Sequence, residues 1–188
     1  MEIRPERPDE VETIRGLTDA AFKGVPHGDE TEAAIVDALR AAGALTLSLV
    51  AVEGGQIVGH AAFSPVTIDS VAGDGVAGGW YGLGPVSVWP ARQRGGFGQA
   101  LIRDGLRRLA DLPAAGCVVL GDPGYYGRFG FESDPELFYA DVPPGYFQRL
   151  VLSGPAPKGE VRYHAGFDAR PFPDQVDSSD PDKKGLEL

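Results

Sequence analysis

The residues Leu83-Gly-Pro-Val-Ser-Val-Trp-Pro-Ala-Arg-Gln-Arg-Gly-Gly-Phe-Gly98 predict a strand, a glycine-rich turn and the start of a helix. The first turn of a helix carries backbone N–H groups without intrahelical partners, and the helix dipole adds partial positive charge there. Glycines let the chain bend tightly and let a ligand approach the backbone. The stretch therefore predicts an anion site, of the kind that binds phosphate groups, at the turn.

The spacing within this turn, Gln93-x-x-Gly96-x-Gly98, argues against two common phosphate loops. A dinucleotide-binding fingerprint needs a third glycine where Leu101 stands. A P-loop needs Gly-Lys-Ser or Gly-Lys-Thr, and the sequence contains neither. Hydride transfer and nucleotide hydrolysis therefore lose support.

The same turn, following an apolar strand, resembles the acetyl-CoA signature of the GNAT superfamily of N-acetyltransferases. A second element, Tyr126-Gly-Arg-Phe-Gly-Phe131, resembles another signature of that family, in which the tyrosine lies near the thiol of the cofactor. The longer strings Leu83–Val88 and Leu120–Phe131 are similar to the bacterial YhbS-like branch. The two signatures occur in the expected order along the chain, which strengthens the resemblance.

The resemblance covers Ile3 to Phe167 and implies an α+β fold with α/β/α layers. It implies one GNAT-like domain, residues 1–167, with a mixed, mostly antiparallel central sheet that splays at the strand carrying Val86 to Val88. Residues 168–188 form an acidic, proline-containing tail, which we expect to be mobile because it has few apolar groups.

The resemblance also implies a set of site residues. The pantetheine arm of acetyl-CoA pairs with the strand at Val86, Ser87 and Val88, as an added strand would. Pro85 has no N–H, so Val86 supplies the first amide, which polarises the thioester carbonyl. Tyr126 donates a proton to the departing thiolate, since a phenol with a pKa of about 10 is protonated at neutral pH. The phosphate groups lie on the turn and first helical residues, Gln93, Arg94, Gly95, Gly96, Phe97, Gly98 and Gln99.

These expectations describe an acetyl-CoA-dependent N-acetyltransferase that acts by direct transfer on a small amine or on a protein or peptide amine. By analogy with other members of the family, a homodimer is expected. An alternative is a non-catalytic acyl-CoA-binding or sensing module, because the glycine-rich turn predicts cofactor binding more directly than it predicts catalysis. A third reading, a helix start in a structural domain, requires that CoA does not bind.

The general base is not evident from the sequence. The strand Trp80 to Val88 carries no carboxylate, and deprotonation through water is one route. His60, Asp122 and Glu30 are candidates, but each has an ordinary structural explanation. These explanations are a hydrogen-bonded strand histidine, a turn or cap acid, and a solvated residue at a helix start.

The formal net charge of −10 argues against a nucleic-acid surface and favours a cationic acceptor. Basic residues nevertheless cluster near the turn, at Arg92, Arg94, Arg103, Arg107 and Arg108. Arg92 and Arg94 are closest to the turn and are the better candidates for phosphate contacts. We expect the other three to form a solvated helix face.

Cysteine and histidine usage argues against a metal site or a thiol nucleophile. His27, His60 and His164 are far apart in the sequence, so no catalytic metal is expected. Cys117 lies in an apolar strand and is expected to be a buried thiol. With one cysteine, no signal-like start and no apolar run of membrane-spanning length, the expected location is the cytoplasm, away from the membrane.

Local patterns predict the remaining elements. The first half contains a strand at Ile3-Arg4, a helix to Phe22 capped by Asp9, a helix between the Gly28-Asp29 break and Gly43, paired strands Leu45–Val52 and Ile57–Ile68, and a loop Asp69–Gly79. The second half contains a helix from Gly98 to Asp111 with Gly105 against the sheet, a buried parallel strand Cys117–Leu120, a short helix from Pro123, a strand from Phe131 and a last strand Val161–Phe167.

Overall fold

A computed structural model describes residues 1–24, 31–70, 76–140 and 142–171. Much of the expected tail, the Gly28-Asp29 break, His27 and Glu30 lie outside the described residues. Within these ranges, no helix is both long and apolar enough to cross a membrane.

The centre of the molecule is a mixed sheet in the order β1-β2-β3-β4-β5-β7. The strands are β1 (Glu2–Pro5), β2 (Leu47–Glu53), β3 (Gln56–Ser70), β4 (Val76–Val88), β5 (Gly116–Leu120), β6 (Leu137–Phe138), β7 (Phe147–Val151) and β8 (Gly159–Tyr163). β4 and β5 run parallel, as do β6 and β8, and the other pairs are antiparallel. The mixed, mostly antiparallel sheet is therefore confirmed.

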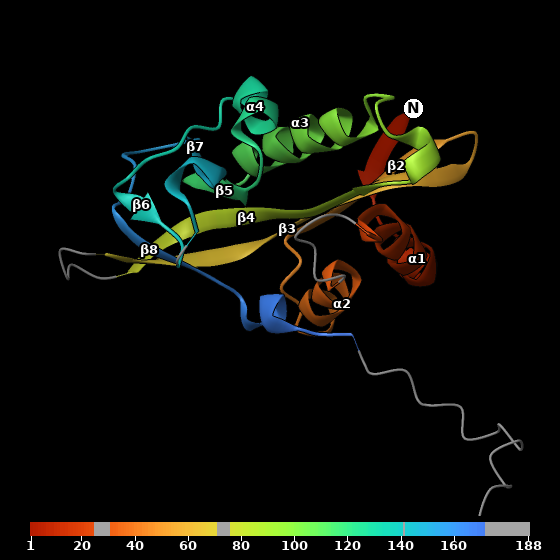
Figure 1. Ribbon diagram of the computed structural model, residues 1–188, viewed down its shortest axis with the longest axis horizontal. Helices are drawn as coiled ribbons and strands as arrows, with labels where there is room; N and C mark the ends of the chain where they lie inside the picture. Colours follow the sequence, from red (N-terminus) through yellow and green to blue (C-terminus); the bar gives the residue numbers. More distant parts are fainter. Residues whose placement is uncertain (25–30, 71–75, 141, 172–188) are drawn as a thin grey trace, which may run out of the picture.

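Helices cover both faces of this sheet (Figure 1). α3 (Phe97–Ala110) and α4 (Pro123–Tyr126) lie on one face, and α1 (Val11–Phe22) and α2 (Glu32–Ala41) lie on the other. Gly105 lets α3 approach the sheet closely, since a Cβ atom there would lie 2.2 Å from Cζ of Phe63. This arrangement confirms the expected α/β/α layers and the close packing at Gly105.

β4 and β5 separate in the middle of the sheet. Their parallel pairing runs from Trp80 opposite Gly116 to Leu83 opposite Val119. Beyond Leu83, β4 continues along β3 as far as the pair Val88 and Gly59, and β5 ends at Leu120. The sheet is therefore splayed beside Val86–Val88, as expected.

Several local expectations are wrong. Asp9 does not cap α1, because Pro8–Glu10 forms a 3-10 helix and Glu10 precedes α1. The expected loop Asp69–Gly79 is largely strand: β3 continues to Ser70 because β8 pairs with its far end, and β4 starts at Val76. Residues 71–75 of that loop lie outside the described part.

The closing segments also differ from expectation. Phe131 starts no strand; it is buried, and the following Glu132 forms an isolated bridge with Arg149. The last strand ends at Tyr163 rather than Phe167, because the His164 side chain caps a 3-10 helix by accepting a hydrogen bond from the Gly166 amide (3.0 Å). That helix places Phe167 against α2, beside Leu39.

Candidate active site

The glycine-rich turn after β4 has the backbone conformation of an anion site. Pro90–Arg92 forms a 3-10 turn, and Arg94 and Gly96 then adopt positive φ angles of 64° and 84°. Gly96 is the N-cap of α3 and has no side chain to occupy the first amides of the helix. These amides therefore have no side-chain partner at the N-cap, as the predicted anion site requires.

A cavity of about 510 Å³ opens at this turn, on the α3 face of the sheet. The expected cofactor residues line it except Ser87 and Gly95; those lining it are Val86, Val88, Gln93, Arg94, Gly96, Phe97, Gly98 and Gln99. Arg92, Tyr125, Tyr126 and Arg128 complete the wall. The fold thus brings the two sequence motifs, more than twenty-five residues apart in the chain, to one cavity.

Ser87 points to the opposite face. Its hydroxyl donates a hydrogen bond to Oγ1 of Thr18 on α1 (3.2 Å), and the residue is 1% exposed. Side chains alternate between the faces of a strand, so Val86 and Val88 face the cavity while Ser87 does not. The Ser87 hydroxyl therefore does not shape this cavity, and a cofactor could meet Ser87 through its backbone.

Tyr126 lies where the sheet splays. Its ring packs edge-on against Tyr125 (centroids 5.1 Å apart) and Phe131 (6.0 Å). Burial raises the pKa of Tyr126 to about 12, and the neighbouring Tyr125 and Cys117 act in the same direction. The phenol therefore carries its proton throughout the physiological pH range and can act as a proton donor.

A second cavity, of about 350 Å³, lies where α1, α2 and the C-terminal 3-10 helix meet β4. It shares Val86 and Tyr126 with the first cavity. α2 lies on the opposite face of the sheet from α3 (Figure 1). The two cavities therefore approach each other from opposite faces at the point where β4 leaves β5.

The arginines near the turn differ in whether they form ion pairs. Arg107 and Arg108 both contact Asp104, as expected for a solvated helix face. Arg92 pairs with Glu53 at 2.8 Å. Arg94 forms no ion pair with another described residue, and it lines the first cavity. Arg94 is thus the better placed of the two turn arginines to contact an anion.

The family is settled by sequence comparison. A family model described as an acetyltransferase (GNAT) domain matches residues 2–133. The chain belongs to the GNAT family of acetyltransferases. The resemblance inferred from the two motifs is therefore confirmed, and the enzyme class is acetyltransferase.

Individual relatives point to the same branch. An uncharacterised N-acetyltransferase YhbS of Escherichia coli K12 is 38% identical over 133 residues, covering 70% of this chain and 74% of its own. A crystal structure of a GNAT family acetyltransferase from Brucella melitensis in complex with acetyl-CoA is 54% identical, with a TM-score of 0.77, and the match covers 89% of this chain and 97% of that one. The structure of E. coli YhbS in complex with CoA is 34% identical, also with a TM-score of 0.77, over 89% and 91%.

Two of the general-base candidates, Asp122 and His60, lie in the described part of the chain, and both have structural roles. Asp122 is the N-cap of α4 and accepts a hydrogen bond from the Gly124 amide (2.9 Å). His60 is fully buried and lines neither of the two cavities. The ordinary explanations of both residues are therefore confirmed.

An acid that sequence reasoning missed lies in the second cavity of this GNAT enzyme. Glu32, the first residue of α2, lines that cavity together with Ile35. The sequence signal for this placement was the spacing of three residues between Glu32 and Ile35, which puts both side chains on one face of a helix. That signal does not say what the helix face contacts, because this depends on β4 and on segments late in the chain.

Two further residues are buried in the core, and for Cys117 this confirms the expected buried thiol. Trp80 is 2% exposed and packs in the core beside Ile68 and Val118. Cys117 is fully buried, and burial raises the pKa of its thiol well above the usual value. A thiol in this state is a poor nucleophile, which favours direct transfer over an acyl-enzyme. Among the described residues, no group of three or more His, Cys, Asp or Glu side chains could hold a metal ion.

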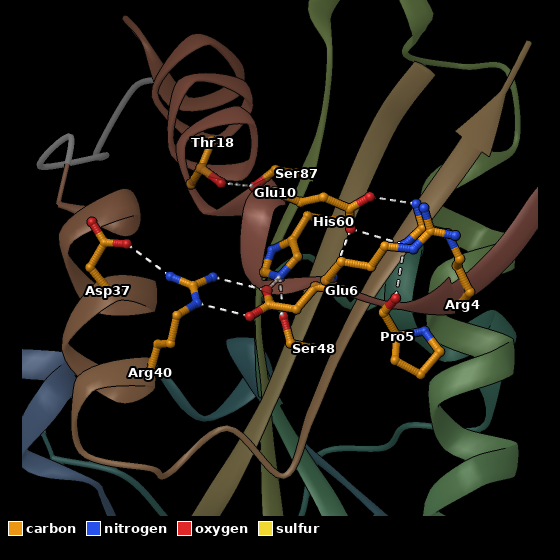
Figure 2. Close-up of polar contacts among 11 residues, drawn as sticks. Arg4, Pro5, Glu6, Glu10, Thr18, Asp37, Arg40, Ser48, His60 and Ser87 are labelled. Carbon is orange, nitrogen blue, oxygen red and sulfur yellow. Dashed lines mark hydrogen bonds and ion pairs between the residues drawn. The ribbon is translucent and has the colours of Figure 1, made fainter. Parts of the chain in front are cut away.

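Figure 2 shows the polar network that connects His60 of β3, through Glu6, with Arg40 of α2. Arg40 contacts Glu6 at 2.8 Å, and the Ser48 hydroxyl donates to the Glu6 carboxylate. Because that hydroxyl proton is committed, Nε2–H of a neutral His60 donates to Oγ of Ser48 (2.8 Å). The network pairs Glu6 with Arg40, and burial keeps the imidazole uncharged, although the Glu6 carboxylate acts in the opposite direction.

This burial predicts acid sensitivity. Burial lowers the pKa of His60 from 6.5 to about 4. Below pH 6.5 the unfolded chain binds a proton that the native state does not, so stability falls as the pH drops toward 4. We expect the free energy of unfolding to decrease by about 2 kcal/mol between pH 7 and pH 5 from this residue. Urea titrations at several pH values measure this slope.

The control is His60→Gln, whose amide cannot titrate. Its free energy of unfolding should change much less between pH 7 and pH 5 than that of the wild type. An equal slope in both proteins would assign the acid sensitivity to other groups.

Proposed function

We propose that this enzyme transfers an acetyl group from acetyl-CoA to a primary amine by direct transfer between the two cavities. The observation that carries the proposal is that Val86 and Tyr126 line both cavities. An acyl donor on the α3 face and an amine on the α2 face would meet at these residues. The predicted cytoplasmic location, homodimer and domain boundary at residue 167 stay predictions.

The first cavity suits the phosphate and pantetheine portions of acetyl-CoA. The backbone amides at the start of α3, from Gly96 to Gln99, would hold the pyrophosphate, with Arg94 adding positive charge. Gln93 is directed back to the strand, where its side-chain amide donates to the Val88 carbonyl (3.3 Å). It would thus position the turn around the phosphates. The unpaired side of β4 at Val86–Val88 suits the amide groups of the pantetheine arm.

Two groups of the chain would carry the chemistry. When bound, acetyl-CoA supplies an activated thioester. The Val86 amide would stabilise the negative charge that develops on the carbonyl oxygen, and Tyr126 would protonate the departing sulfur. Because Cys117 is buried and protonated, no thiol of this chain competes for the acyl group.

Calorimetric titration tests this proposal first. We expect acetyl-CoA to bind with a dissociation constant in the micromolar range, while ATP and NAD give no saturable heat. A panel of primary amines should then release CoA thiol in the presence of enzyme and acetyl-CoA. Absence of acetyl-CoA binding would contradict the assignment of both motifs.

A further inference from the structure

The second cavity differs chemically from the first. Its wall is mainly apolar and aromatic, and Glu32 is its one charged side chain among the described residues. A volume of about 350 Å³ is at the small end of the range for small-molecule sites. The cavity therefore suits a compact molecule that is largely apolar and carries one cationic group.

One carboxylate oxygen of Glu32 lacks a partner. Oε2 is buried and has no hydrogen-bond partner among the described residues. A buried, unsatisfied carboxylate oxygen is costly, and a bound ammonium group would remove that cost. Two other described acids at α2 are already paired: Asp37 contacts Arg15 and Arg40, and Glu6 contacts Arg40.

Three aromatic residues form one side of the cavity. Tyr139 and Tyr163 pack edge to face with their centroids 4.9 Å apart, and Phe167 lies 4.5 Å from Tyr163. They come from three separate segments: the loop after β6, the end of β8 and the C-terminal 3-10 helix. Such a wall offers both edges and faces for packing against a further ring.

We propose that the acceptor is a small primary amine with an aromatic body, and that Glu32 binds its ammonium group and takes its proton. This inference rests on the proposed function, because it places the amine on the α2 face opposite the acyl donor. Phe167 and the two tyrosines hold the ring, and the nitrogen reacts beside Tyr126, which lines both this cavity and the first one. A peptide or polyamine acceptor fits less well, since its extra polar groups would meet an apolar wall.

In this acetyl transfer, Glu32 is the proton acceptor and Tyr126 is the proton donor. Glu32 accepts one proton from the ammonium group, which frees the lone pair on nitrogen. The nitrogen forms a bond to the thioester carbonyl carbon, and the C–S bond breaks with its electrons passing to sulfur. Tyr126 gives its proton to sulfur and regains one from the acylated nitrogen. Glu32 then releases its proton to solvent, leaving amide, thiol and one proton.

Binding of a chosen probe tests the cavity without turnover. We expect 2-phenylethylamine to bind the wild-type protein measurably in calorimetry. The uncharged 2-phenylethanol and the ring-free ethylamine should each bind at least tenfold more weakly. The isosteric Glu32→Gln variant should lose most of the affinity for 2-phenylethylamine, whereas Glu12→Gln, which removes an exposed acid of α1, should bind as the wild type does.

Turnover then separates this proposal from the proposed function. In Glu32→Gln we expect kcat/KM for 2-phenylethylamine to fall at least thirtyfold while the affinity for acetyl-CoA stays within twofold. Phe167→Leu should raise KM for 2-phenylethylamine more than KM for ethylamine. Circular dichroism and thermal unfolding verify that each variant is folded.

Each remaining outcome has a distinct meaning. If acetyl-CoA does not bind the wild type, the proposed function fails. If acetyl-CoA binds and the enzyme prefers spermidine or a lysine peptide to 2-phenylethylamine, the aromatic-amine proposal is overturned and the acetyl transfer proposal stands. Equal activity of Glu32→Gln and the wild type would overturn the role of Glu32.

Discussion

The Tyr126→Phe variant should retain acetyl-CoA binding and lose about a thousandfold in kcat, within the range for loss of a general acid. The substitution removes one hydroxyl and keeps the ring that packs against Tyr125 and Phe131. Without the phenolic proton, the thiolate must leave unprotonated or be protonated by solvent. The affinity for acetyl-CoA should change less than twofold, because the phosphate turn is untouched.

Steady-state thiol release together with calorimetry measures both quantities. Tyr146→Phe is a matched control, since it removes a phenol from a side chain that is 54% exposed and lies in neither cavity. An unchanged kcat in Tyr126→Phe would remove Tyr126 from the mechanism. A parallel loss of acetyl-CoA affinity would instead indicate that the hydroxyl shapes the cavity.

The pH dependence offers a second check of the same role. Because the pKa of Tyr126 is raised to about 12, the donor stays protonated well into the alkaline range. Wild-type kcat should therefore show no decline between pH 7 and pH 10 that originates from this residue. If the proton donor had an ordinary phenolic pKa of about 10, half of it would be deprotonated at pH 10, and kcat would fall by half.

Local sequence signals were enough to predict the half of the molecule to which we assign the acyl donor. The strand before Val88, the glycine turn and α3 are adjacent in the chain, so their geometry follows from glycine conformation, helix periodicity and strand patterning. The apolar run at Cys117–Leu120 then indicated a buried parallel strand beside β4, and the separation of these strands places Val86 and Tyr126 together.

The second cavity, where we propose that the acceptor binds, could not be predicted in the same way. The second cavity combines Glu32 from α2 with Tyr163 and Phe167 from the end of the described chain. Phe167 was expected in a strand, and the local pattern did not reveal that the His164 side chain would end that strand and turn the chain toward α2. The placement of Glu32 in this cavity therefore depends on tertiary contacts, and nothing in the local sequence distinguishes it from Glu30, the candidate base named from the sequence.

The extension of β3 and β4 has the same origin. Glycine and small residues between Asp69 and Gly79 predicted a loop, because they have low strand propensity. The pairing of Ile68 with both Val161 and Ala77 shows that neighbouring strands override that preference. A pairing partner more than ninety residues away in the chain cannot be read from the composition of the segment itself.

The phosphate turn leads to the second large effect, which we expect from Gly98→Asp. Gly98 is the second residue of α3 and lines the first cavity. A carboxylate near a helix N-terminus favours folding of the helix, so the free energy of unfolding should be unchanged or higher. The same carboxylate would repel a bound pyrophosphate by about 3 kcal/mol, which corresponds to roughly a hundredfold loss of acetyl-CoA affinity.

Gly98→Asn separates charge from size. A Cβ atom at position 98 would lie 3.3 Å from the hydroxyl of Tyr125, and this contact is equal in the two variants. The difference in acetyl-CoA affinity between Asp and Asn therefore reports the charge effect, and it should shrink as salt screens the repulsion. If the two variants bind acetyl-CoA equally well at low salt, the phosphates do not lie at the start of α3, and the anion site must be sought elsewhere on the first cavity, beginning with Arg94 and Arg128.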